Sequence, residues 1–362
     1  MDDRPPAGKP DELRLGPQEL LEQSRTRRRP ALLSRSVAGA AAPAHEAGRC
    51  EARQYDDEAL PTGRQLELLR GGVRAVVAEV GATLRALEVG GLEVLDGFER
   101  DGIPEDARGQ ALMPFPNRVD RGRYVFHGVA HQLPLDEADR GNALHGLVRW
   151  LNWAPLSHSP SRLVMGLVLH AREGYPFVLS LRIAYTLTGT GLRVRQTARN
   201  LGSRPAPYGA GFHPYLSVGI PRIDAAALRL PAQTYFLTNP RLLPVGRAAV
   251  AATPFDFRLA RPIGRTVMDT GFTDLARDPD GLARVELSAP DGGPRVTVLL
   301  DGAYQFLQVY TGDTLSDVSA RRRSIAIEPC TCAPNALNNG LGLRALAPGE
   351  TFSSAFEIAA TV

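Results

Sequence analysis

The sequence predicts an all-β fold built as an unusually large antiparallel sandwich. From residue 65 onward, short runs of alternating apolar and polar residues are separated by glycine-rich turns, which is the pattern of paired antiparallel strands. Sustained helical periodicity is hard to find there, and no fixed internal period indicates a propeller or a solenoid. The 362 residues, 43% of them hydrophobic, are enough to bury a large core.

The expected strands follow one another as a meander and three hairpins. The meander has strands at 65–69, 72–77, 82–89 and 92–95, with Gly90-Gly91 in its last turn. The hairpins join 123–126 to 129–133, 179–187 to 192–200, and 295–300 to 304–310. The last of these is expected because Asp301-Gly302 is a strong hairpin dipeptide.

Residues 1–55 differ from the rest of the chain. They are rich in Pro, Arg, Ala and Gly and have no aromatic residue before Tyr55, so they lack the apolar surface that would offset chain entropy. We predict a disordered tail, with a short amphipathic helix at 12–25 as its one candidate element. Because no linker-like composition interrupts residues 60–360, we predict that residues 56–362 form a single domain.

Charge and composition exclude several function classes. The net charge is +3, with the basic residues spread along the chain, which argues against nucleic acid and against a membrane surface as partners. Lys9 is the only lysine, so the folded part offers no amine for a Schiff base or a P-loop. Three cysteines, two of them in CxC spacing, do not indicate a disulfide framework or a zinc site. We expect a cytoplasmic monomer or homodimer whose partner is a small, roughly neutral molecule.

Two segments far apart in the sequence each place a titratable side chain among apolar or rigid neighbours. His213 lies in Gly-Phe-His-Pro-Tyr, and Glu328 lies in Ile-Ala-Ile-Glu-Pro. Burying the Glu328 carboxylate in an apolar strand is costly without partners, so function explains this residue better than packing does. His145 offers a second imidazole and Arg118 a cation. Together these residues indicate an acid/base site for a neutral polyol.

The chain resembles the aldose 1-epimerase, or galactose mutarotase, family from about residue 60 to the C-terminus. The order and spacing of the matching stretches make the resemblance specific. They are Pro116-Asn-Arg118 with Gly122-Arg-Tyr124, Asn142-Ala-Leu-His-Gly146, Gly211-Phe-His-Pro-Tyr215, Asp269 before Phe272, Leu307-Gln-Val-Tyr-Thr311, and Glu328-Pro329 leading to Pro334-Asn335-Ala336. The resemblance implies a large antiparallel β-supersandwich and interconversion of the α and β anomers of a free hexose, with no metal and no organic cofactor.

Carried onto this chain, the resemblance assigns His213 as the general acid at the ring oxygen and Glu328 as the general base at the anomeric hydroxyl. The ordinary pKa values, about 6.5 for histidine and about 4.3 for glutamate, would supply a partly protonated acid and an ionised base near neutral pH. The residues implied to bind substrate are Arg118, His145, Asp269, Gln308 and Asn117. Asp274 is the alternative to Asp269 if the alignment shifts, and Trp150 is a candidate for stacking on the sugar.

Two alternatives on the same scaffold remain open. One is an epimerase of a phosphorylated or sulfonated hexose, in which Arg149 or Arg121 would bind the anion. Phe212 before the motif histidine and Pro-Cys-Thr-Cys after Glu328 depart from the galactose-type pattern. By these departures the chain resembles the bacterial branch of uncharacterised or sulfosugar-type mutarotases more than the galactose-pathway enzyme, which leaves the sugar preference open. The other is a carbohydrate-binding protein without catalysis. A glycoside hydrolase is more distant, because that chemistry usually employs two carboxylates.

Overall fold

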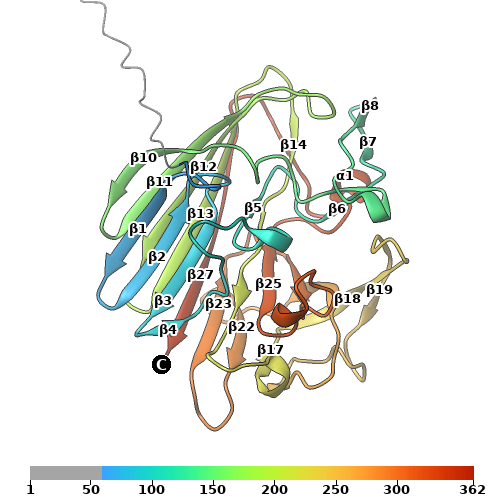
Figure 1. Cartoon of the computed structure of the whole chain (residues 1–362). Coiled ribbons are helices and arrows are strands. Elements are labelled where there is room, and N and C mark those ends of the chain that lie inside the picture. The colour runs from blue at the N-terminus through green and yellow to red at the C-terminus, as the bar shows by residue number, and fades with distance from the viewer. Residues whose placement is uncertain (1–58) are drawn as a thin grey trace, which may run out of the picture. The chain divides into compact units, whose positions relative to one another are not determined.

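The structure is a computed structural model that describes residues 59–362, and its regular elements are almost all strands (Figure 1). This confirms the prediction of an all-β fold. Every strand pair is antiparallel. The predicted tail at 1–55, with its candidate helix at 12–25, lies outside the described residues.

Two large sheets and one smaller sheet form the framework. The four-stranded sheet has the order β1 (Gln65–Arg70), β2 (Val73–Ala78), β3 (Leu84–Val89), β4 (Leu92–Glu93). The nine-stranded sheet has the order β10 (Ala154–Ser159), β11 (Arg162–Leu169), β12 (Leu179–Leu187), β13 (Gly191–Asn200), β27 (Thr351–Thr361), β23 (Arg295–Leu300), β22 (Ala283–Ser288), β17 (Ala227–Arg229), β20 (Arg261–Pro262). The eight-stranded sheet has the order β19 (Pro244–Ala249), β18 (Ala232–Thr238), β21 (Asp269–Leu275), β24 (Phe306–Tyr310), β25 (Ile325–Cys330), β15 (Gly211–Phe212), β5 (Ala111–Leu112), with β16 (Tyr215–Leu216) also paired to β25.

Short elements complete the described part of the chain. Three two-stranded sheets pair β14 (Ala206–Tyr208) with β26 (Arg344–Leu346), β6 (Arg118–Asp120) with β9 (Asn142–Leu144), and β7 (Arg123–Phe126) with β8 (Val129–Gln132). The helical elements are η1 (Glu105–Ala107), η2 (Ala138–Arg140), η3 (Ile223–Ala225), η4 (Val318–Ala320) and α1 (Ala336–Asn339). Within the part of the chain that the structure describes, helices lack the length and apolarity needed to cross a membrane.

The alternating sequence pattern corresponds to strands with one buried face. In β12, Leu179, Leu181 and Ile183 point into the core while the residues between them are partly or fully exposed, as the period of two in a strand requires. Full burial of each such side chain is worth about 1.5–3 kcal/mol. The four-stranded sheet contacts the nine-stranded sheet at β12 and β13, so the predicted meander covers one part of the large sheet.

The hairpin predicted around Asp301-Gly302 is wrong. β23 pairs with β22 and β27, whereas β24 pairs with β21 and β25 in the other large sheet. The turn therefore carries the chain from one sheet to the other. The dipeptide does form a turn, in which Tyr304 N–H donates to the Asp301 carbonyl at 3.2 Å. The two flanking strands nevertheless pack into different sheets, because each buries its apolar face against different neighbours.

A buried polar bridge links the two large sheets behind the site. Tyr304 donates its hydroxyl to Gln196 of β13 at 2.7 Å, and the Gln196 side chain donates to the carbonyl of Gly211 in β15 at 3.0 Å. Ser354 of β27 donates to the Tyr304 hydroxyl at 3.1 Å. A satisfied network of this kind fixes one arrangement of the layers, and here it holds the strand that leads into His213.

Candidate active site

A polar pocket of about 380 Å³ opens beside the eight-stranded sheet. Strands β21, β24 and β25 supply one wall, and the turn between β15 and β16 supplies His213. The remaining lining comes from segments 103–107 and 136–150, from Asn117 and Arg118 at the start of β6, and from Tyr215 and Thr314. All seven residues proposed for the site from the sequence line this pocket. They are Asn117, Arg118, His145, His213, Asp269, Gln308 and Glu328.

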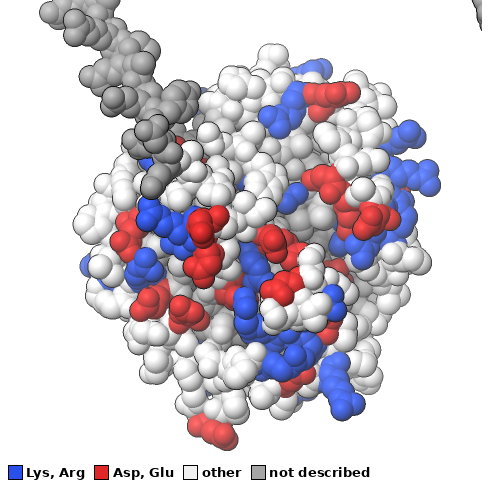
Figure 2. Space-filling model, in the orientation of Figure 1, with Lys and Arg blue, Asp and Glu red and all other residues white. Residues whose placement is uncertain are grey.

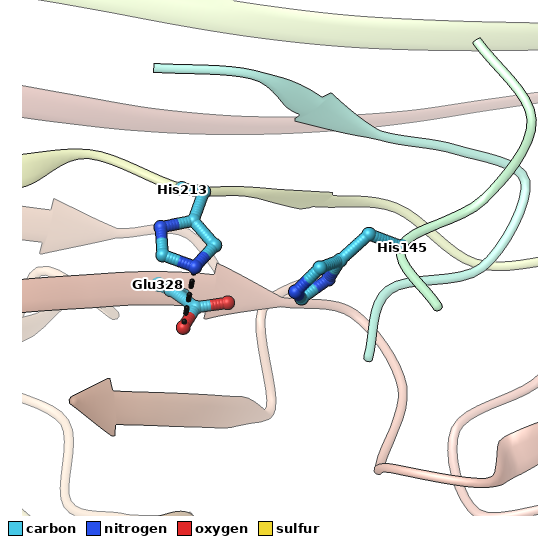
Figure 3. Close-up of side chains that lie close together, drawn as sticks. All are labelled: His145, His213 and Glu328. Carbon is cyan, nitrogen blue, oxygen red and sulfur yellow. Dashed lines mark ion pairs between the residues drawn. The ribbon is translucent and has the colours of Figure 1, made fainter. Parts of the chain in front are cut away.

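Strand register explains why His213 and Glu328 meet. Gly211 pairs with Cys330, and Tyr215 pairs with Ala326, so the position midway, His213, lies opposite Glu328. His213 Nε2 is 3.3 Å from Glu328 Oε1 (Figure 3). Both side chains are almost fully buried, at 5% and 2% exposure.

Burial shifts the two pKa values toward the uncharged forms. Desolvation lowers the pKa of His213 to about 3, and nearby Arg149, Arg108 and Arg118 act in the same direction. Desolvation, followed by the charge of Asp269, raises the pKa of Glu328 well above its usual range. The ordinary pKa values expected from the sequence are therefore wrong for this buried pair. With the His213 pKa lowered and the Glu328 pKa raised, the two side chains together hold one proton over a wide range of pH.

Each member of the pair keeps one polar atom without a partner. Among residues 59–362, His213 Nδ1 and Glu328 Oε2 are two of only four buried side-chain nitrogen or oxygen atoms that lack a hydrogen bond. Such atoms cost free energy in a packed interior. Glu328 lines the pocket, so a substrate hydroxyl that reached Oε2 would satisfy it.

His145 is held in one tautomer. Its Nδ1 accepts the backbone N–H of Asn117 at 3.2 Å, so the neutral ring carries its proton on Nε2. Burial and the charge on His213 lower the pKa of His145 well below its usual range, which keeps the ring neutral. His145 can therefore donate one hydrogen bond from Nε2, and its ring lies edge-on to His213, with the centroids 5.3 Å apart.

The backbone around His145 and Asn117 is strained to hold this contact. Both residues have positive φ, 61° and 58°, a conformation that costs about 1–3 kcal/mol for a non-glycine residue. Gly146, which follows, also has positive φ, and a Cβ there would lie 2.2 Å from the carbonyl oxygen of Met113. The side chain of Asn117 accepts the N–H of Arg118 at 2.8 Å, so this residue shapes the turn as well as lining the pocket.

Arg118 is held by a carboxylate that the sequence analysis missed. Its Nε lies 3.0 Å from both oxygens of Glu137, and its terminal nitrogen lies 3.6 Å from Asp269. Burial alone would raise the pKa of Glu137, but hydrogen bonds from Arg118 and Asn142 and the charge of Arg140 lower it overall. In the sequence, Glu137 is one of three acidic residues in Asp-Glu-Ala-Asp, a composition typical of an exposed loop. Nothing in that pattern distinguishes Glu137 from the other two acidic residues.

Asp269, not Asp274, faces the pocket. Gln308 donates to Asp269 Oδ1 at 2.5 Å, which joins the two predicted sugar-binding residues across β21 and β24. Asp274 lies further along β21 and is exposed. Trp150 lines the mouth of the pocket with 53% of its surface exposed, a position from which an indole can cover a sugar.

Tyr215 stacks against the His213 ring and supports it. The two rings stack with centroids 5.0 Å apart and 23° between their planes. The guanidinium carbon of Arg108 lies 4.3 Å from the centroid of the same tyrosine ring, and Arg108 is paired with Asp96 at 2.9 Å. These contacts fix the direction in which His213 presents Nε2.

The three buried groups His145, His213 and Glu328 bring their ligand atoms within 4.8 Å of one another. Two histidines and one carboxylate could hold a divalent metal. However, a metal at His145 Nε2 would require the ring proton on Nδ1, where it would face the N–H of Asn117. The hydrogen bonding of the site therefore fits a proton donor at His145 better than a metal ligand.

Comparison with known proteins matches nearly all of the described part of the chain to one protein family. The sequence profile of aldose 1-epimerase matches residues 64–359. The uncharacterised protein YihR of Escherichia coli is 30% identical over 82% of this chain and 93% of its own length. The galactose mutarotase of Homo sapiens is 28% identical over 58% of this chain and 66% of its own length.

Solved structures show the same fold. An aldose epimerase homologue from C. elegans superposes with a TM-score of 0.73 at 17% identity, covering 82% of this chain and 98% of that one. Galactose 1-epimerase from Lactobacillus acidophilus superposes with a TM-score of 0.67 at 22% identity, covering 81% and 92%. At these identities the likeness establishes the architecture, a galactose mutarotase-like β-supersandwich.

Proposed function

Because the chain belongs to the aldose 1-epimerase family, we propose that it interconverts the α and β anomers of a free hexose by acid/base opening and closure of the sugar ring. The observation that carries this proposal is the contact between His213 Nε2 and Glu328 Oε1, 3.3 Å apart inside the polar pocket. The ring oxygen and the anomeric oxygen of an aldose are bonded to the same carbon. One donor and one acceptor this close together can therefore serve both oxygens at once.

Ring opening transfers two protons in opposite directions. Glu328 removes the proton of the anomeric hydroxyl, His213 gives a proton to the ring oxygen, and the bond between C1 and the ring oxygen breaks to leave an aldehyde. Rotation about C1–C2 presents the other face of the aldehyde, and the reverse transfers close the ring. Each positioned acid or base contributes about 10²- to 10⁴-fold in rate.

The shifted pKa values fit this cycle because the pair carries one proton at every stage. Opening starts with the proton on His213 and ends with it on Glu328, and closure starts from that second arrangement. Burial favours the second arrangement, in which both groups are uncharged. The proton returns to His213 either through the sugar or directly across the 3.3 Å contact.

The remaining pocket residues suit the hydroxyls of a neutral sugar. Arg118 and the Nε2–H of His145 donate hydrogen bonds, and Asp269 accepts them. Carboxyl groups outnumber guanidinium groups in the lining: Glu105, Asp106, Asp136, Glu137, Asp269 and Glu328 against Arg118, Arg140 and Arg149. This excess of acid supports a neutral hexose over a phosphorylated or sulfonated one. Arg149 donates to Asp136 at 3.0 Å, and Arg121 lies outside the lining.

Anomer exchange measured by polarimetry or NMR on a panel of free hexoses tests the proposal, with a hexose 6-phosphate as the anionic member. We expect exchange of at least one neutral sugar well above the spontaneous rate, and losses of about 10²-fold or more in His213→Ala and Glu328→Ala. Turnover of the anionic sugar alone would contradict the neutral-sugar assignment. Saturable sugar binding without faster exchange would instead establish a non-catalytic binding protein.

A further inference from the structure

His145 and His213 reach the pocket from two separate segments of the chain (Figure 3). His213 lies in the turn between β15 and β16, and His145 directly follows β9. Strand β15 pairs with β5 in the eight-stranded sheet, whereas β9 pairs with β6 in a small sheet. Strand pairing therefore does not by itself set the distance between the two imidazoles. A backbone hydrogen bond from Leu147 to the Met113 carbonyl, at 2.7 Å, ties the segments together on the C-terminal side of His145.

The side chain of Arg149 links the same two segments on the other side of His145. Its Nη1 donates to the side-chain oxygen of Gln110 at 3.4 Å, and its Nη2 donates to the carbonyl of Leu144, the residue before His145, at 3.3 Å. The Gln110 amide donates in return to the Arg149 carbonyl at 3.1 Å. The Gln110 carbonyl accepts the backbone N–H of His213 at 3.0 Å. One guanidinium thus connects the backbone on both sides of the site.

Asp136 holds this guanidinium in place. Its Oδ2 accepts Arg149 Nη2 at 3.0 Å, and its Oδ1 accepts the backbone N–H of Leu144 at 2.6 Å. Arg149 and Asp136 together therefore contact both polar backbone groups of Leu144. The planar, forked guanidinium suits acceptors on two sides, whereas the compact ammonium of lysine lacks this rigid spread of donors.

Arg149 differs from the arginines at the protein surface. On the face shown in Figure 2, acidic and basic side chains are interspersed in contact with solvent. The Arg149 side chain is only 14% exposed and lines the sugar pocket, where a fixed charge acts more strongly on its neighbours than it does in water. Burial is the main reason that the pKa values of His145 and His213 are low, and the charge of Arg149 lowers both further.

We propose that Arg149 is a positioning residue for anomer exchange, which holds the segments of His145 and His213 at the spacing, 5.3 Å between ring centroids, that lets both imidazoles act on one sugar. This inference rests on the proposed function. It assigns Arg149 to the alignment of the acid/base site and not to an anionic substituent of the substrate. Misplacement of a reacting group by about 1 Å costs about 10²-fold in rate, which sets the size of the expected effect.

Kinetics of anomer exchange in Arg149→Gln, on a neutral hexose, test this role. We expect kcat to fall about 10²-fold while KM stays within about twofold of the parent value. The acid decline of kcat should begin at a higher pH than in the parent, because a charge that helps to keep His213 neutral is gone. A higher KM at the parent kcat would make Arg149 a sugar-binding residue and overturn the proposal, as would parent values of both constants.

Arg149→Lys keeps the charge but removes the fork, and it decides the question if Arg149→Gln does not fold. We expect the parent pH profile and KM, with kcat lower by about tenfold because one ammonium does not hold Gln110 and Leu144 together. A parent kcat in Arg149→Lys would show that charge alone matters, and the positioning role would be wrong.

Arg121→Gln is the matched control for loss of one guanidinium. Arg121 is exposed and lies outside the pocket lining, so this variant should keep the parent kcat, KM and pH profile. A parent protein that exchanges no hexose would refute the proposed function and this inference with it. An active parent whose Arg149 variants are equally active would refute only the inference.

Discussion

Replacement of Glu137 by glutamine tests whether this residue positions Arg118 for the sugar. The carboxylate receives Arg118 Nε at 3.0 Å on both oxygens, Arg140 at 3.0 Å and the Asn142 amide at 2.8 Å. Glutamine keeps one acceptor oxygen but puts an NH₂ group where the second stood. That group faces donors, and the change leaves Arg118 with only Asp269, 3.6 Å away, as a counter-charge.

The structure sets the size of the expected effects. The side chains of Arg118 and Glu137 are 10% and 9% exposed, close to the buried limit at which removing one partner of an ion pair costs about 3–5 kcal/mol. We take the lower end, about 3 kcal/mol of unfolding free energy, because Asn142 and the remaining oxygen still hydrogen-bond. Without Glu137, Arg118 would turn away and lose one good hydrogen bond to the sugar. A loss of about 1.4 kcal/mol in binding free energy raises KM about tenfold.

Urea unfolding and anomer-exchange kinetics measure the two effects separately. We expect lower stability and a higher KM for Glu137→Gln, with a kcat close to the parent value because the His213–Glu328 pair is unchanged. Glu105→Gln removes an exposed carboxylate from the same pocket lining and should change neither quantity. A Glu137→Gln protein with the parent KM and stability would refute the positioning role.

Three further predictions follow from the buried pair and the pocket mouth. Because burial raises the Glu328 pKa above its unfolded value, the unfolding free energy of the parent should fall as pH rises from about 4.3 toward the folded pKa. Glu328→Gln should lack this fall and be the more stable protein at pH 8, which urea unfolding at two pH values measures. Since the His213 pKa is lowered to about 3, kcat should stay level between about pH 5 and 7 and decline only as alkali ionises Glu328, whereas an apparent pKa near 6.5 would contradict the coupled pair. Trp150→Ala should raise KM about three- to tenfold through lost contact with the sugar, with no change in the pH profile.

Local pattern was enough to predict most strands and the site segments. The runs around β12 and β13 alternate strictly, and their core faces are buried as that alternation requires. His213 and Glu328 were recognisable because each polar side chain interrupts an apolar or rigid segment. Their approach to each other depends on the pairing of β15 and β16 with β25, and such long-range register is not encoded in either segment alone.

The features that the sequence analysis missed depend on tertiary contacts. Asp301-Gly302 makes the turn that its residues favour, but the destination of each flanking strand is set by packing in two different sheets. Glu137 looks like any acidic loop residue until Arg118 is brought against it. The pKa values of the proposed catalytic pair, His213 and Glu328, likewise follow from burial, which a reference value for an isolated side chain does not include.

The most direct test of the proposed mechanism is a double-mutant cycle on anomer exchange, measured by NMR magnetisation transfer on a sugar that the parent protein turns over. His213→Asn, Glu328→Gln and the double variant are compared with the parent at one pH. Two groups that pass one proton through the same sugar act as a unit, so the double variant should lose little more activity than either single variant. Additive losses, or single variants as active as the parent, would contradict the shared-proton mechanism.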